Sequence, residues 1–135
     1  MNYSYDMYPS QQQYMDMGTG FTTMPAMYPH KQFVNKVENC AATCFNMMSK
    51  MVDKQDVRQR EQQIKLLHDC ARICQSQVVY TVVSSDFDRA HANFCASVCE
   101  RCGNECLRFQ DAESQNCARI CLDCAEACRR HAGMM

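Results

Sequence analysis

Two stretches of this 135-residue chain repeat the cysteine pattern C-x3-C-x2-C-x3-C. On an α-helix with about 3.6 residues per turn, the four positions of each pattern fall within an arc of about 60° over a length of about 16 Å. Each stretch therefore predicts a helix that carries a straight stripe of thiols. The stripes are Cys95, Cys99, Cys102 and Cys106, followed by Cys117, Cys121, Cys124 and Cys128.

Two further cysteine pairs, Cys40/Cys44 and Cys70/Cys74, use the same four-residue step, so all twelve cysteines follow one scheme. Disulfides within a helix are disfavoured, because Cβ atoms at this step lie about 5–6 Å apart and a disulfide needs about 3.5–4.5 Å. Disulfides between helices are a separate possibility, and oxidising conditions could form them. Soft thiolate ligands at this density favour a site for soft metal ions.

Charge and the start of the chain limit the compartment and the partners. A net charge of −1 argues against nucleic acid or an anionic membrane as the main partner. The first residues lack the basic and apolar regions of a secretory signal, and no apolar run reaches the ~20 residues that span a bilayer. We therefore expect a cytoplasmic protein with reduced thiols, where dense cysteine indicates metal or redox chemistry.

Residues 1–29 differ from the rest of the chain, since they hold five of the six tyrosines, six of the eleven methionines and all three prolines. They show no apolar periodicity that would bury a face, so we expect a disordered tail. Two other roles stay open for this segment. It could dock a partner protein, or its spaced thioethers could bind Cu(I) directly.

Periodicity from His30 onward predicts four helices, at about 31–52, from Asp53 or Asp56 to about 83, at about 87–109, and from 111–114 to just before Gly133. Ser85 and Asp88 have the spacing of a capping box for the third helix. Helices of roughly 20–27 residues joined by short turns predict an all-α, antiparallel up-down-up-down four-helix bundle over residues 30–135.

Antiparallel folding also predicts which sulfurs meet. A turn near Asp111 places the last two stripes level in four pairs: Cys106 with Cys117, Cys102 with Cys121, Cys99 with Cys124, and Cys95 with Cys128. A turn near residues 84–85 places Cys74 level with Cys95 and Cys70 with Cys99, and Cys40 and Cys44 fall near the Cys70 level. We expect the thiols to form a column along the bundle axis.

Five other side chains are candidate ligands at the ends of this column. Met47 and Met51 continue the stripe of the first helix, and thioethers bind Cu(I), although methionine also fills cores. His30, His91 and His131 are expected at the opposite mouth, where imidazoles would receive a metal ion first; solvated histidines at helix ends are the alternative. The fourth histidine, His68, is expected on the surface.

The cysteine spacing also bears on the choice of metal. Structural zinc sites take about four ligands in closed tetrahedra, and the ferredoxin spacing C-x2-C-x2-C-x3-C-P is absent. A continuous column offers many two- and three-sulfur sites, which suit Cu(I). Three alternatives stay open: cysteines as small buried hydrophobes, a thiol redox protein, and a bundle with a structural metal that the tail docks to a larger assembly.

Phe94–Cys106, Asn116–Cys128 and Asp69–Cys74 resemble the bacterial copper storage proteins, and the resemblance covers about residues 33–132. It implies a cytosolic, cysteine-lined four-helix bundle that stores many Cu(I) ions per chain through its twelve cysteines and serves copper homeostasis. It also implies a homotetramer without enzymatic turnover. The first helix departs from the family pattern, because Met47 and Met51 stand where a run of cysteines is usual.

Overall fold

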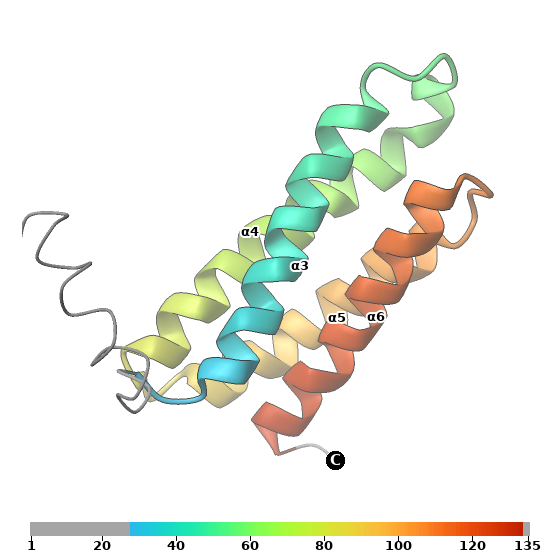
Figure 1. The fold of residues 1–135 in the computed structure, drawn as a ribbon. Helices are drawn as coiled ribbons and strands as arrows, with labels where there is room; N and C mark the ends of the chain where they lie inside the picture. Colours follow the sequence, from blue (N-terminus) through green and yellow to red (C-terminus); the bar gives the residue numbers. More distant parts are fainter. Residues whose placement is uncertain (1–27, 134–135) are drawn as a thin grey trace, which may run out of the picture.

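The computed structural model describes residues 28–133 and shows a bundle of four α-helices with no strand among those residues. The helices are α3 (Lys31–Met51), α4 (Glu61–Val82), α5 (Asp88–Cys106) and α6 (Ala112–Ala132), and the short 3-10 helix η2 (Val57–Arg60) precedes α4. In Figure 1 successive helices run in opposite directions along the bundle. The predicted all-α antiparallel bundle is therefore confirmed, whereas the expected tail falls, for residues 1–27, outside the described residues.

Two of the predicted helix caps are wrong, because the side chains expected to form them have other partners. The second helix, α4, also begins later than predicted, whereas α5 begins within one residue of the predicted start. The Asp56 carboxylate accepts a hydrogen bond from Arg60 Nε at 2.8 Å, and the chain forms the 3-10 turn of η2 before α4 begins. Ser85 Oγ accepts from the Phe87 N–H at 3.1 Å, while Asp88 turns into the bundle, so no capping box forms.

The two ends of α6 match the sequence prediction. Asp111 Oδ2 accepts the Ser114 N–H at 2.9 Å, which satisfies one of the free donors in the first turn. Gly133 ends the helix in the left-handed region, with φ of 78°, where glycine has no Cβ to cause strain. The Asp111 cap fixes where α6 begins, and therefore the register of its cysteines against α5.

Small residues beside the cysteines let the helices pack closely. Ala41, Ala71, Ala96 and Ala118 are buried next to the thiols, while larger apolar side chains are few in the described core. At Gly103, an added Cβ would lie 2.8 Å from Leu122 Cγ and 3.1 Å from a backbone oxygen of α6. The α5/α6 pair therefore approaches more closely than a larger residue would allow, which brings two cysteine stripes together.

None of the described helices is long and apolar enough to cross a membrane.

Candidate metal centre

Every cysteine of the chain is free and completely buried in the bundle axis, with an exposed fraction of 0%. Steps of three and four residues keep successive thiols of one helix on one face. The four inward faces meet along the axis, so each helix contributes sulfur to one interior. The contributors are Cys40 and Cys44 of α3, Cys70 and Cys74 of α4, Cys95, Cys99, Cys102 and Cys106 of α5, and Cys117, Cys121, Cys124 and Cys128 of α6.

Short contacts between sulfur atoms confirm the predicted register. The Sγ atoms of Cys74 and Cys95 are 3.8 Å apart, and those of Cys70 and Cys99 are 3.6 Å apart. The Sγ atom of Cys121 on α6 lies 3.9 Å from that of Cys102 on α5. A continuous chain of Sγ···Sγ contacts of 3.5–4.0 Å joins nine cysteines: Cys95, Cys74, Cys99, Cys70, Cys40, Cys121, Cys44, Cys102 and Cys117.

Two groups of four thiols are compact enough for one metal ion each, with all four sulfur atoms within 4.8 Å of one another. Cys40 belongs to both groups, so the groups share a ligand and cannot act as two separate closed sites. The first group is Cys40, Cys74, Cys99 and Cys124, and the second is Cys40, Cys44, Cys70 and Cys121.

The close packing of the thiols raises the pKa of some of them and lowers the pKa of others. Hydrogen bonding with Cys124, together with burial, raises the pKa of Cys99 well above its ordinary value. Hydrogen bonding from Cys106 lowers the pKa of Cys102 to about 7, and hydrogen bonding from Cys128 lowers the pKa of Cys124 to about 7. A few thiolates are therefore accessible at neutral pH, whereas thiols such as Cys99 keep their protons until a metal ion displaces them.

At one end of the column, a buried polar layer takes the place of further sulfur. Met47 and Met51 are buried as the stripe predicts, with exposed fractions of 4% and 0%. Met51 Sδ accepts a hydrogen bond from Arg60 Nη1 at 3.1 Å, so one of its two lone pairs is engaged. Met47 borders a groove of ≈410 Å³ between α3 and α6.

The histidine end has its own buried hydrogen-bond network, built around the Asp88 carboxylate. Gln77 Nε2 and Thr81 Oγ1 donate to Asp88 Oδ1 at 2.7 and 2.8 Å. His131 Nε2 lies 2.8 Å from Asp88 Oδ2. His91 Nδ1 lies 2.6 Å from Gln77 Oε1, and it must donate because that oxygen is an acceptor.

All three histidines predicted for this mouth lie there. The ring centroids of His30 and His131 are 4.8 Å apart, and Phe33 stacks on His131 at 4.1 Å. His91 packs against Tyr80 at 4.5 Å, and its burial lowers its pKa. A neutral His91 ring that donates through Nδ1 keeps the lone pair of Nε2 as a metal donor.

The fourth histidine is on the surface, as the sequence predicts. The His68 side chain is exposed and lies 3.3 Å from an Asp69 carboxylate oxygen.

Buried polar residues at the two ends were not predicted. Gln63 and Gln77 of α4 and Ser114 of α6 are completely buried, each with an exposed fraction of 0%. The sequence did hold a signal for them, because each continues a cysteine stripe at a helical step. Gln63 precedes Cys70 by seven residues, Gln77 follows Cys74 by three, and Ser114 precedes Cys117 by three.

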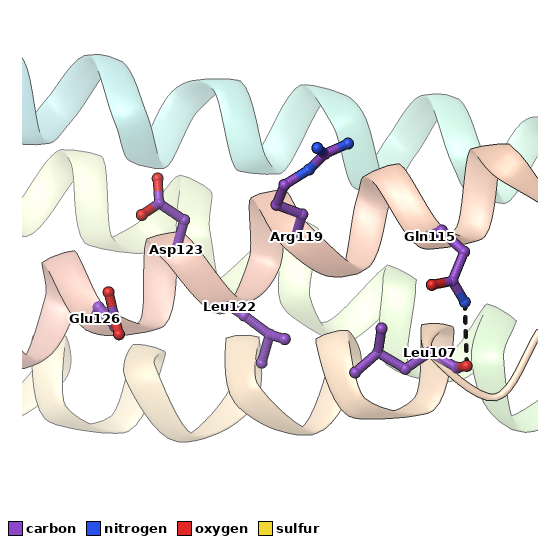
Figure 2. Close-up of a pocket in the computed structure, with 6 residues that line it drawn as sticks. All are labelled: Leu107, Gln115, Arg119, Leu122, Asp123 and Glu126. Carbon is purple, nitrogen blue, oxygen red and sulfur yellow. Dashed lines mark hydrogen bonds between the residues drawn. The ribbon is translucent and has the colours of Figure 1, made fainter.

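One groove of the described surface lies outside this interior. Figure 2 shows it between α5 and α6, where it is ≈590 Å³ in volume and is lined by Leu107, Gln115, Arg119, Leu122, Asp123 and Glu126. Gln115 Nε2 donates to the Leu107 carbonyl at 3.2 Å, and Asp123 pairs with Lys36 at 3.0 Å. Its lining holds no cysteine, so it is separate from the thiol column.

Fold and site together define a cysteine-lined four-helix bundle that can hold soft metal ions. A sequence profile described as copper storage protein matches residues 26–133. The chain therefore belongs to the copper storage protein family. A search of curated proteins finds no match.

Solved structures of copper storage proteins are similar to this chain. Cu(I)-bound BsCsp3 is 29% identical, with a TM-score of 0.72, over 76% of this chain and 96% of that chain. Apo-Csp3 from Bacillus subtilis is 30% identical, with a TM-score of 0.71, over 76% of this chain and 97% of that chain. Ccsp from Streptomyces lividans, loaded with 10 copper equivalents, is 23% identical, with a TM-score of 0.74, over 85% of this chain and 96% of that chain, and supports the fold alone.

Proposed function

We propose that this protein binds and stores several Cu(I) ions per chain through cysteine thiolates in the bundle interior. The observation that carries the proposal is the continuous chain of Sγ···Sγ contacts of 3.5–4.0 Å, which runs through all four helices. Neighbouring sulfurs at this spacing can share ions without large movements of the backbone. Membership of the copper storage protein family supports the same conclusion.

The sharing of sulfurs favours Cu(I) over zinc. A structural zinc site is a closed tetrahedron of about four ligands. Cys40 belongs to both four-thiol groups, so two such tetrahedra would compete for it. Cu(I) prefers soft sulfur donors, and a continuous column offers it many overlapping sites.

All twelve cysteines are the proposed ligands. Met47, which borders the α3/α6 groove, is a further proposed ligand, whereas Met51 offers only the lone pair that Arg60 does not engage. We place His30, His91 and His131 at the entrance, where imidazole nitrogens pass Cu(I) to the first thiols. Each thiol that binds copper releases its proton to water, so loading releases acid.

Anaerobic titration of the reduced protein with Cu(I) against a competing chelator tests the proposed function. Storage predicts roughly as many ions per chain as cysteines, because neighbouring thiolates share ions. The far-UV circular dichroism should stay almost unchanged, since the four helices already surround the sites. Binding of only one to three ions, or a preference for Zn(II), would contradict storage.

We also propose that the protein has no catalytic turnover and that it is located in the cytoplasm. The buried column of free thiols lies away from the α5/α6 surface groove, and reduced cysteines at this density fit a reducing compartment. Recovery of the protein in a secreted fraction of its source cells would contradict that location.

We also propose that the chain forms a homotetramer, and that the outer face of α4 and α5 contacts a second copy. Phe94 is 51% exposed beside a groove that Leu66, Ile73 and Val98 also line. Asp69 and Arg101 border the same groove. Around a twofold axis, the carboxylate of one copy can face the guanidinium of the other, so the surface is self-complementary.

Replacing Phe94 by Glu is expected to shift the protein to a smaller species in size-exclusion chromatography with light scattering, because a charge would be buried in the contact. Phe87→Glu is the matched control, since Phe87 is 70% exposed and lies outside the groove. An unchanged mass for Phe94→Glu would contradict the proposal that this face forms a contact between subunits.

A further inference from the structure

A buried guanidinium occupies the end of the bundle opposite the histidines. Arg60 lies in η2 at the tip of the molecule, yet it is only 5% exposed. Its Nη1 atom donates to Met51 Sδ at 3.1 Å and to Ser114 Oγ at 3.3 Å. Its Nε and Nη2 atoms donate to the carboxylates of Asp56 and Asp111 at 2.8 and 2.9 Å. One side chain therefore ties the end of α3 to η2 and to the start of α6.

Gln63 links this guanidinium to the thiol column. Arg60 Nη1 donates to Gln63 Oε1 at 3.0 Å, which fixes the orientation of the amide. Gln63 Nε2 then donates to Ser114 Oγ at 2.9 Å and lies 3.5 Å from Cys106 Sγ. Cys106 is the last cysteine of α5. The space beyond this thiol is thus filled by an ordered layer of hydrogen-bonded side chains.

An aromatic ring and two carboxylates hold the Arg60 guanidinium in this layer. The ring of Phe109 lies 4.4 Å from the Arg60 guanidinium, a distance at which an aromatic face attracts a cation. The two carboxylates are on the more exposed side of the guanidinium, because the Asp56 and Asp111 side chains are 39% and 21% exposed. A Cu(I) ion that approached from the thiols would therefore meet the Gln63 amide and then the guanidinium before it reached either carboxylate.

The opposite end carries different chemistry. Its buried network is built on the Asp88 carboxylate, with His131 and His91 at its edge. A carboxylate and imidazoles have lone pairs that can bind Cu(I), whereas a guanidinium has only N–H donors and none to offer a metal. The two ends of the sulfur column therefore differ in whether the groups beyond the last thiols can act as ligands.

We propose that Arg60 is the plug of a closed end, positioned by Gln63, so that Cu(I) enters and leaves the thiols at other points of the bundle. Arg60 does not coordinate the metal; it acts by filling the axial exit beyond Cys106 with a hydrogen-bonded group that has no lone pair for a metal. The consequence for copper rests on the proposed storage function, while the closure of this end does not.

Residue-resolved alkylation of the reduced apo protein tests the plug without copper. Brief exposure to iodoacetamide, followed by peptide mass spectrometry, gives the labelling rates of Cys106 at this end and Cys95 at the other. In Arg60→Ala the ratio of the Cys106 rate to the Cys95 rate should rise by about tenfold or more, as expected when a barrier is lowered at one end. General loosening of the fold would raise both rates together and leave the ratio unchanged.

Arg58→Ala is the matched control, because Arg58 is an exposed arginine of the same 3-10 helix, and it should leave the ratio unchanged. Gln63→Ala keeps the guanidinium and opens the layer beside Cys106, so it should raise the ratio even if Arg60→Ala fails to fold. Unchanged ratios in the folded variants would overturn the plug.

Copper release gives the second readout. From the loaded protein, Arg60→Ala should release Cu(I) to a chelator about tenfold faster than the unsubstituted protein, with the same number of ions bound. A raised labelling ratio with no multi-ion binding would leave the plug standing and overturn storage. Multi-ion binding with unchanged labelling ratios would support storage and overturn the plug.

Discussion

Replacing Cys40 by serine is expected to lower the copper capacity by about two ions or more per chain, because this sulfur serves both four-thiol groups. Its Sγ atom lies 4.0 Å from that of Cys70 on α4 and 3.9 Å from that of Cys121 on α6. Cys40 thus joins the part of the column next to the histidines to the part next to Arg60. Its loss should also weaken the binding of ions that remain. Anaerobic Cu(I) titration against a chelator measures both effects.

Cys128→Ser is the matched control, because Cys128 is equally buried and belongs to neither four-thiol group. Both variants place the same hydroxyl in the core, so their difference reports the position of the sulfur. Cys128→Ser should cost about one ion or none. Far-UV circular dichroism and thermal unfolding of the apo forms check that both variants fold. Equal losses in the two variants would show that Cys40 has no special place in the column.

The sulfur column could be predicted from the sequence because it depends on local helix geometry and on two short turns. A repeat of three and four residues fixes which face each thiol takes, and the turn before Ala112 fixes the level of α6 against α5. The facing of Cys102 and Cys121, whose Sγ atoms are 3.9 Å apart, follows from these two facts. The errors in the predicted helix ends, of which the late start of α4 is the largest, did not alter the facing pairs.

The polar layers at the two ends could not be predicted in the same way. Arg60 is buried only because Asp56 turns toward it and because Asp111, 51 residues further on, accepts its Nη2 hydrogens. Asp88 has the spacing of a local cap, but its carboxylate accepts from Gln77 and Thr81 of the neighbouring helix. In both cases a partner on another element outweighs the local preference.

Copper binding is expected to weaken as the pH falls, because each thiol must lose its proton before it can bind Cu(I). Hydrogen bonding with Cys102, together with burial, raises the pKa of Cys121 well above its ordinary value, so this thiol is protonated throughout the neutral range. For every proton released per ion bound, the affinity should fall about tenfold with each unit of pH. Cys102 and Cys124 have pKa values lowered to about 7, so above that pH they contribute little to the proton release. The dependence should therefore be steeper below neutrality than above it.

Proton release measured directly in a weakly buffered, anaerobic Cu(I) titration checks the sign and the size of this effect. Loading at about pH 6 should release more protons per ion than loading at about pH 8, because the two thiols of lowered pKa are protonated only at the lower pH. The chelator titrated alone at each pH corrects for its own protons. In Cys102→Ser the difference between the two pH values should shrink, because one of the two thiols of lowered pKa is removed. Loading without proton release would mean that the thiols are not the ligands.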